Sequence, residues 1–334
     1  MTAVARELTR RDIEKLGIVP AGEDVRLTPL AGGVSSDICK VEAGGRVFVV
    51  KRALPKLRVA DDWHAPISRN RHEADWLELV DRILPGAVPR VLAREDQAGL
   101  FAMEHLDPSV FPVWKERLRD GDVDVAFAAE VGRRLVAIHA HTAGDPAVAE
   151  RFATAPIFHA IRLEPYFEAA ARRHPEAAGP LLELSAQTLA ARVALVHGDI
   201  SPKNILGGPR GPVFLDAECA WFGDPAFDLA FCLNHLLLKC LWNRPAAPRL
   251  LHAFDALAAA YREGVTWEPR AAMEQRTARL LAALLLARVD GKSPVEYLTA
   301  ADRELVRQTA VPIVLAPVPS PDDIRQMWTA RLGA

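Results

Sequence analysis

The spacing of apolar residues changes near residue 105, and this change constrains the fold of the 334-residue chain more than any other feature. Between residues 25 and 52, apolar and polar residues alternate, and Gly32-Gly33 and Gly44-Gly45 interrupt the alternation. Alternation with glycine turns predicts an antiparallel meander of strands. A helix is predicted from residue 70 to about residue 83, and residues 100–103 predict a further strand.

After Leu106 the apolar residues follow helical spacing. This spacing predicts helices over residues 124–141, 181–193, 250–262, 270–289 and 322–332, whereas the proline-rich stretch 311–321 predicts a surface connector. The fold class is therefore predicted to be α+β and bilobal. A small antiparallel β-sheet lobe, residues 1–104, precedes a large mainly helical lobe, residues 105–334.

Composition and charge exclude several kinds of partner. The net charge is −2, and Lys and Arg are scattered, so the basic stripe expected of a nucleic-acid binder is missing. The polar N-terminus resembles no signal peptide, and the apolar runs are too short or too polar to span a bilayer. The four cysteines are widely spaced, which favours buried free thiols in a reducing compartment. A soluble cytoplasmic protein is expected, and its oligomeric state stays open.

One loop and the strand after it carry the chemistry. Asp199 and Asn204 lie five residues apart, and Asp216 follows the apolar stretch Val213 to Leu215. A carboxylate such as Asp199 can orient a hydroxyl and accept its proton, so it is the candidate catalytic base. Asn204 and Asp216 offer the hard oxygens that bind Mg²⁺. Lys203 can add positive charge, and the set predicts phosphoryl transfer.

This pattern resembles the catalytic and metal-binding loops of protein kinases, with Gly198 in place of Arg and Asp216-Ala217-Glu218 in place of Asp-Phe-Gly. His-Gly-Asp with four residues before Asn is similar to the aminoglycoside phosphotransferase family, which is related to choline, homoserine and methylthioribose kinases. The segment 223–230 is also typical of that family, and the Asp-x-Glu turn leans toward methylthioribose kinases. The resemblance implies a protein-kinase-like fold with ATP and Mg²⁺ as cofactors.

The resemblance also implies a nucleotide site in the first half of the chain. Lys51 would pair with the phosphates of ATP, and Glu73 would hold Lys51 in place. The turn 31–37 would cover the phosphates with backbone N–H groups and the Ser35 and Ser36 hydroxyls. The adenine would bind backbone groups at the hinge, residues Met103, Glu104 and His105. Asp228 is expected to be buried behind the catalytic loop, bonded to its backbone or to His197.

The acceptor is expected between the two lobes and against the helical half. Glu218, Trp221 and Asp224 are tentative acceptor contacts, since carboxylates and an indole suit a polyol or an amine-bearing molecule. Arg162 is a further tentative contact, although a helix start before the packed Tyr166 is the more common meaning of that segment. A sugar, an aminoglycoside or an amino alcohol fits these residues. The sequence leaves the acceptor open.

Two other functions stay open at this point. A nucleotide-binding pseudokinase that regulates a partner would retain the same residues. A protein kinase is disfavoured, because Ala217-Glu218 runs almost directly into Gly223-Asp224-Pro225 and leaves no room for an activation segment.

Overall fold

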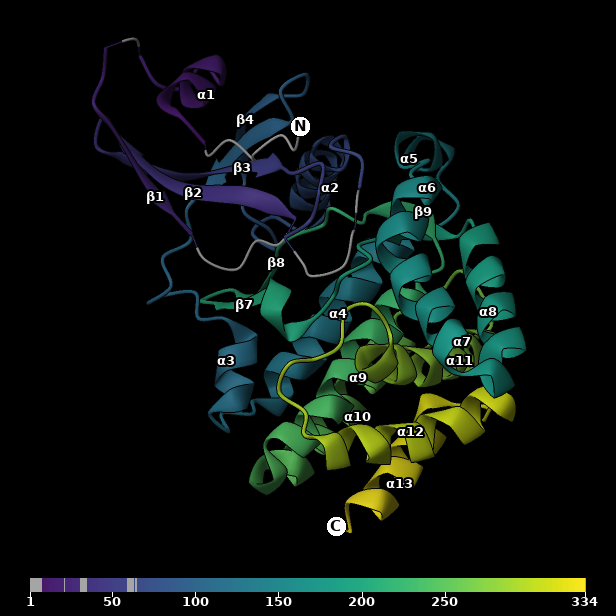
Figure 1. Ribbon diagram of the computed structural model, residues 1–334. Helices are drawn as coiled ribbons and strands as arrows, with labels where there is room; N and C mark the ends of the chain where they lie inside the picture. The colour runs from purple at the N-terminus through teal and green to yellow at the C-terminus, as the bar shows by residue number, and fades with distance from the viewer. Residues whose placement is uncertain (1–7, 21, 31–34, 59–62, 64, 334) are drawn as a thin grey trace.

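The computed structural model describes residues 8–20, 22–30, 35–58, 63 and 65–333. A five-stranded antiparallel sheet forms one end of the molecule, in the order β1-β2-β3-β5-β4 (Figure 1). Its strands are β1 (Val25–Pro29), β2 (Ser36–Ala43), β3 (Arg46–Ala53), β4 (Val91–Glu95) and β5 (Leu100–Glu104). Two helices, α1 (Arg10–Lys15) and α2 (Arg69–Ile83), accompany this sheet. The predicted meander and the first predicted helix are confirmed.

The β2–β3 hairpin sets the direction of the site residues on the sheet. Gly44 and Gly45 both have positive φ, 56° and 70°, which only glycine adopts without strain and which suits a tight two-residue hairpin turn. Phe48 and Val50 of β3 are buried with α1 and the outer strands. Because side chains alternate along a strand, Val49 and Lys51 point to the opposite face, and both line the cavity described below.

The rest of the chain is mainly helical. Its α-helices are α3 (Trp114–Arg119), α4 (Val125–Thr142), α5 (Pro146–Arg151), α6 (Ala155–Phe158), α7 (Ala169–Arg173), α8 (Ala178–Ala190), α9 (Ala226–Trp242), α10 (Ala247–Glu263), α11 (Arg270–Asp290), α12 (Ala300–Leu315) and α13 (Pro321–Leu332). The 3₁₀ turns are η2 (Pro175–Ala177), η3 (Pro202–Asn204) and η4 (Arg244–Ala246), and η1 (His159–Glu168) is a π-helix. Two small antiparallel sheets pair β6 (Ala194–Val196) with β9 (Trp221–Gly223) and β7 (Ile205–Gly208) with β8 (Gly211–Phe214), and only the second pair is a hairpin.

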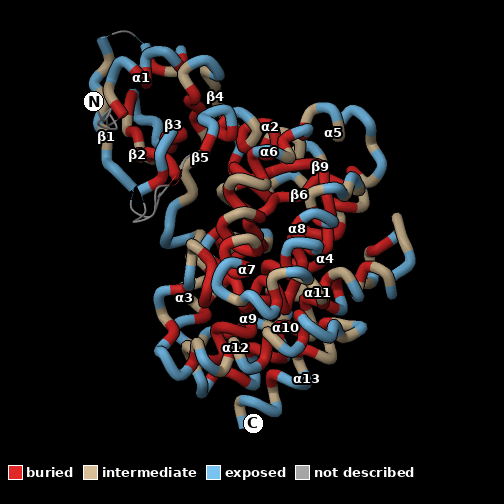
Figure 2. The backbone as a smooth tube through the Cα atoms, turned by 45° about the vertical axis from the view of Figure 1, so that its right-hand side comes forward, coloured by how far each residue is buried: buried red, intermediate tan, exposed pale blue. Residues whose placement is uncertain are grey.

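The main core lies among these helices. Figure 2 shows buried backbone concentrated along α4, α9, α10 and α11. Residues 226–241 of α9 are all buried, which explains why this helix is apolar on every side and lacks a clear polar face. The structure confirms the α+β prediction, with an antiparallel sheet followed by a mainly helical half.

Several local predictions differ from the structure. Residues 91–95 form β4, a strand that was not predicted from the sequence. The stretch predicted as a connector from residue 311 belongs to α12 as far as Leu315, because Pro312 removes one backbone donor without ending the helix. The helix predicted to residue 193 ends at Ala190, and β6 follows. All four cysteines are buried as predicted, and Cys219, Cys232 and Cys240 are free thiols.

No helix among the described residues combines the length and the apolar character needed to cross a membrane.

Candidate active site

The loop after β6 is held in place by a buried carboxylate. Asp228, in the first turn of α9, accepts hydrogen bonds from the backbone N–H groups of His197 and Gly198, each at 2.7 Å. Asp228 is fully buried and also lies 3.3 Å from Nε2 of His139. The prediction that Asp228 bonds to the backbone behind the loop is confirmed.

The imidazole of His197 connects the loop to the segment after β8 that carries Asp216. Its Nδ1 accepts a hydrogen bond from the backbone N–H of Asp199 at 3.1 Å, and its Nε2 donates to the carbonyl of Leu215 at 3.0 Å. An N–H can only donate and a carbonyl can only accept, so the ring is the neutral Nε2–H tautomer. Burial lowers the pKa of His197, which keeps this tautomer neutral. His197 therefore has a structural role.

Gly198 occupies a position that no larger residue fits. Its φ is +81°, and a Cβ built there would lie 2.7 Å from Cβ of Cys219. Both the backbone conformation and the close neighbour require glycine. This explains why glycine stands where protein kinases have Arg.

Asp199 is buried and surrounded by donors. Its Oδ2 lies 2.9 Å from Nη2 of Arg162, 3.2 Å from Nζ of Lys203 and 2.9 Å from Nδ2 of Asn204. Burial by itself would raise the pKa of Asp199, but the charges of Arg162 and Lys203 outweigh burial, and the pKa is lowered. The carboxylate is therefore ionised and fixed in orientation.

Lys51 joins the sheet to the site. Its Nζ lies 2.7 Å from Oε2 of Glu73 and also bonds to Oδ1 of Asp216, a residue 165 positions away in the sequence. Lys51 and Glu73 are almost fully buried, with side chains 2% and 1% exposed. Burial raises the pKa of Glu73 to about 7, against the opposing charge of Lys51. For Asp216, the pKa is lowered because Lys51 and Lys203 outweigh burial.

Asn204 and Asp216 present oxygens suited to a divalent cation. Nδ2 of Asn204 donates to a carboxylate oxygen of Asp199, which fixes the amide orientation and leaves its Oδ1 as the atom that can bind a cation. Asp216 has φ of +66°, the one positive value among the described residues other than glycine, and its side chain is 28% exposed. Among the described residues no cluster of three or more His, Cys, Asp or Glu side chains is placed to bind a metal. Two protein oxygens fit Mg²⁺, which takes its other ligands from water and phosphate.

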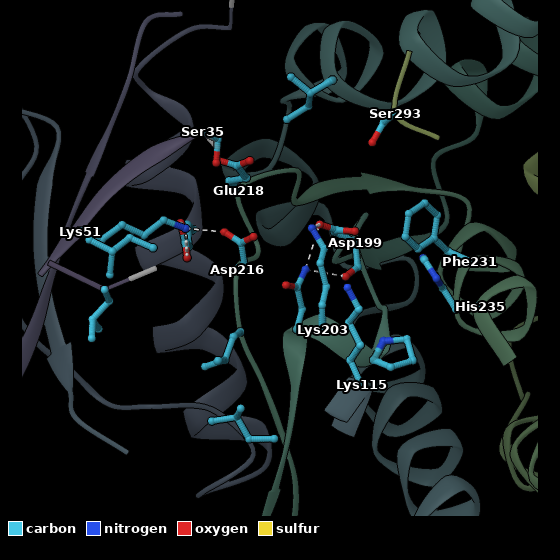
Figure 3. Close-up of a pocket in the computed structure, with 18 of the residues that line it drawn as sticks. Ser35, Lys51, Lys115, Asp199, Lys203, Asp216, Glu218, Phe231, His235 and Ser293 are labelled. Atoms are coloured by element: carbon cyan, nitrogen blue, oxygen red, sulfur yellow. Dashed lines mark hydrogen bonds and ion pairs between the residues drawn. The ribbon is translucent and has the colours of Figure 1, made fainter. Parts of the chain in front are cut away.

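One cavity of about 730 Å³ connects these groups. Figure 3 shows Lys51 and Asp216 on one side of Asp199, and Phe231 and His235 on the other. On the Lys51 side the wall is mainly apolar and includes Met103, Glu104 and His105, the residues predicted to form the hinge. The apolar residues there are Leu30, Ile38, Val49, Pro89, Leu206 and Leu215.

Of the turn predicted to cover the phosphates, residues 31–37, the structure describes only residues 35–37. Residues 31–34 of this turn lie outside the described residues. Ser35 lines the cavity, whereas Ser36 is buried and does not.

The tentative acceptor contacts require correction. Glu218 lines the cavity, but its carboxylate is paired with the buried Arg69, whose Nε lies 3.0 Å from Glu218 Oε2. Trp221 is 0% exposed and stacks on Phe158, with ring centroids 4.3 Å apart, so it belongs to the core. Asp224 lies two residues before α9 and is paired with Arg276 at 2.9 Å, away from the cavity lining. Arg162 does line the cavity.

The sequence analysis missed several charged residues of the site. Arg69 donates to the carbonyls of Ser35 and Leu54 as well as to Glu218, and no spacing signals such a role. Lys115, Lys239 and Arg288 line the helical side of the cavity. Lys239 had a usable signal, since it lies in the otherwise apolar run from Leu229 to Leu241.

Comparisons with known proteins agree with this geometry. The family model APH, described as the phosphotransferase enzyme family, matches residues 26–264. The methylthioribose kinase of Pectobacterium atrosepticum is 26% identical over 269 residues, which cover 73% of this chain and 65% of that kinase. The methylthioribose kinase of Bacillus thuringiensis is 24% identical, covering 61% of this chain and 58% of the kinase. The chain therefore spans less than two thirds of the length of these curated relatives.

Solved structures share the fold. The amicoumacin kinase hAmiN, in complex with AMP-PNP, Ca²⁺ and Ami, superimposes with a TM-score of 0.54 at 16% identity, covering 96% of this chain and 97% of that one. The Plasmodium vivax ethanolamine kinase gives a TM-score of 0.52 at 10% identity, covering 96% and 84%. Both are small-molecule kinases by name, and the likeness shows that this chain has their fold. From the family match over most of its length, the chain belongs to the phosphotransferase enzyme family, APH.

Proposed function

We propose that this protein transfers the γ-phosphoryl group of ATP to a hydroxyl of a small molecule, in a reaction that depends on Mg²⁺. The observation that carries the proposal is the convergence of two charged sets on one cavity. Strand β3 contributes Lys51 and helix α2 contributes Glu73, and the helical half contributes Asp199, Asn204 and Asp216.

Each residue has a role that its geometry supports. Lys51, fixed between Glu73 and Asp216, supplies a buried positive charge for the phosphates of ATP. Asn204 and Asp216 would hold Mg²⁺, which neutralises negative charge on the phosphates when it is bound. Met103, Glu104 and His105 line the apolar end of the cavity, where the adenine would bind.

The transfer step needs one base and no covalent intermediate. The acceptor oxygen forms a bond to the γ-phosphorus, while the bond between that phosphorus and the β–γ bridging oxygen breaks and ADP leaves with the electron pair. The hydroxyl proton passes to a carboxylate oxygen of Asp199 and then to solvent. Arg162 and Lys203 hold that carboxylate in place. The contribution of such a base is on the order of 10²- to 10⁴-fold in rate.

The size of the cavity supports a small acceptor. Its volume of about 730 Å³ includes the nucleotide end, so the remaining space suits a molecule of sugar or amino-acid size. The curated relatives are named methylthioribose kinases, which also supports a small hydroxyl compound. An amine-bearing acceptor is less well supported, because the two carboxylates expected to bind its amine are already paired. Glu218 is paired with Arg69, and Asp224 with Arg276.

The test is ADP release by the purified full chain with ATP, Mg²⁺ and a panel of hydroxyl compounds. We expect release to depend on one class of acceptor, to stop on chelation of Mg²⁺, and to fall at least 10²-fold in Asp199→Asn while nucleotide binding is retained. Asp145→Asn, which alters an exposed cap of α5, is the matched control and should keep full activity. Nucleotide binding without turnover on any acceptor would instead favour a regulatory pseudokinase.

A further inference from the structure

The helical side of the cavity contains a buried cation that forms no ion pair with any of the described residues. The residue Lys239 is 1% exposed, yet it lines the cavity. Its Nζ lies 4.6 Å from the ring centroid of Trp242 and 4.9 Å from that of Tyr297. These rings attract the ammonium but carry no net charge, and no hydrogen bond or ion pair joins Nζ to a described residue. A buried ammonium normally requires an anion or several acceptors.

A second cation in the same part of the cavity is paired with no carboxylate in the part of the chain that the structure describes. Arg288 of α11 donates to the backbone carbonyl and the hydroxyl of Ser293, and to the hydroxyl of Tyr166 at 3.2 Å. All of these acceptors are neutral. Its Nε is buried and has no hydrogen-bond partner among the described residues.

The other charges near Lys239 do not compensate these two cations. Lys115 is paired with Glu296 at 2.6 Å, and the carboxylate of Glu296 is the acidic group that acts on Lys239. His235, one turn before Lys239 on α9, has a pKa well below its ordinary value because of burial and the neighbouring cations, and is neutral. The net charge of the side chains on this side of the cavity is therefore positive.

The positive region is close to the candidate base. Arg162, which is paired with Asp199, lies 5.7 Å from the ring centroid of Tyr166, and Arg288 lies 5.7 Å from the same ring. One tyrosine ring thus separates Arg288 from the arginine that holds Asp199. Figure 3 shows Phe231 and His235 on this side of Asp199, away from Lys51. A small acceptor can present a hydroxyl to Asp199 and a second group to this region.

We propose that Lys239 and Arg288 form an anion-binding subsite, so that the natural acceptor is a hydroxyl compound with a carboxylate or a phosphate group. The statement that the bound anion belongs to a phosphoryl acceptor rests on the proposed function. Binding of the anion itself does not require turnover. The anion would supply the charge and the hydrogen-bond acceptors that the two side chains lack, and its own chemistry would not change during transfer.

The first experiment compares matched acceptors with ATP and Mg²⁺. One series is gluconate, glucose and glucosamine, another is glycerate, glycerol and serinol, and glucose 6-phosphate and glycerol 3-phosphate are the phosphate arms. We expect the best kcat/KM for an anionic member, at least tenfold above its neutral and cationic counterparts. The ratio of the carboxylate to the phosphate arm identifies which anion is used.

The second experiment separates a binding role from a structural one. In Lys239→Met and Arg288→Met, the KM of the anionic acceptor should rise at least tenfold, while the KM of ATP stays unchanged. Lys239→Arg should restore most of the acceptor KM. Arg133→Met removes an exposed cation of α4 that is paired with Glu130, and it should change neither constant.

The third experiment measures binding without turnover. The same anions are titrated by calorimetry into the protein saturated with a nonhydrolysable ATP analogue, so that the nucleotide site is occupied. Wild type should bind at least one of them tenfold more tightly than Lys239→Met does. If wild type binds anions in this way but turns over no acceptor, the subsite stands and the kinase proposal fails.

The opposite result overturns the inference alone. A preference for neutral or cationic acceptors, with KM unaffected by Lys239→Met, would leave the kinase proposal intact and reject the anion subsite. Anion binding equal in wild type and Lys239→Met would also reject it.

Discussion

Arg162 and Asp199 form a buried ion pair, with Nη2 of the arginine 2.9 Å from Oδ2 of the carboxylate. The guanidinium also donates from Nε to the carbonyl of Gly198 at 2.6 Å, so it holds both the candidate base and the loop beneath it. Arg162 lies on a π-helix, a rare conformation that is frequent at functional sites. The tentative acceptor contact is thus also a positioning residue for the base.

Removal of this arginine should change the pH dependence of the reaction. Arg162 lowers the pKa of Asp199, so Arg162→Met should raise that pKa. A base with a higher pKa becomes protonated earlier as the pH falls, and the acidic limb of kcat should move to higher pH. The measurement is a pH–rate profile from about pH 5 to pH 8. Arg172→Met, an exposed arginine paired with Glu164, is the control, and a limb that stays in place would contradict the positioning role.

Loss of Lys51 should destabilise the protein as well as inactivate it. Lys51→Met leaves Glu73 buried without its cation, which costs on the order of 3 kcal/mol in the free energy of unfolding. Since burial raises the pKa of Glu73 to about 7, the cost should be smaller at pH 5, where Glu73 accepts a proton, than at pH 8.

The double variant tests this cause. Lys51→Met with Glu73→Gln removes the buried charge and should recover most of the stability, measured by urea denaturation, but none of the activity. Lys40→Met, on the same sheet but 30% exposed and paired with Glu42, should cost less than about 1 kcal/mol. Equal loss in the single and the double variant would show that the ion pair is not the reason.

Gly198→Ala should damage the loop through both backbone strain and contact. The residue would have φ of +81° and a Cβ only 2.7 Å from Cβ of Cys219. A loss of about 1–3 kcal/mol in stability is expected, together with a large fall in kcat. Gly144→Ala isolates the strain, because Gly144 has φ of +70° but nothing within 4 Å of a built Cβ. Gly144→Ala should lose about 1 kcal/mol of stability and keep its kcat. Equal losses in the two variants would show that the contact with Cys219 does not contribute to the effect of Gly198→Ala.

Lys239→Met should make the ligand-free protein more stable. Burial, followed by the charges of Lys115 and Arg288, lowers the pKa of Lys239 to about 7, while Glu296 opposes the shift. Between about pH 7 and pH 10, Lys239 is protonated in the unfolded chain but neutral in the folded protein, so the stability falls as the pH falls through this range. The destabilisation by Lys239 is therefore greatest below pH 7. His235 contributes no charge, because burial keeps it neutral.

The measurement is the unfolding free energy of both proteins at pH 6 and pH 9. Lys239→Met should exceed wild type by on the order of 2 kcal/mol at pH 6 and by less at pH 9. A variant that is less stable than wild type at both values would show that the lysine is held by favourable contacts, and the argument for a buried unsatisfied cation would fail.

The local patterns of the chain determined much of the fold. Alternation with Gly44-Gly45 predicted the β2–β3 hairpin, and helical spacing predicted α4, α10, α11 and α13 close to their observed limits. The grouping of Asp199, Asn204 and Asp216 could also be predicted from the sequence. Only the short β7–β8 hairpin separates Asn204 from Asp216, so the two residues at its ends remain close in space. Such signals are local, so the sequence carries them directly.

Long-range pairing decided the rest. Glu218 and Asp224 read as free carboxylates in the sequence, but Arg69 and Arg276 neutralise them from distant helices. Trp221 is removed from the cavity by the pairing of β9 with β6, which places its ring against Phe158. Arg162 reaches Asp199, and Lys239 and Arg288 face the cavity together, only because α9, α11 and the π-helix pack side by side. The sign of the charge in a pocket is a sum over such distant partners, and only the tertiary structure decides that sum.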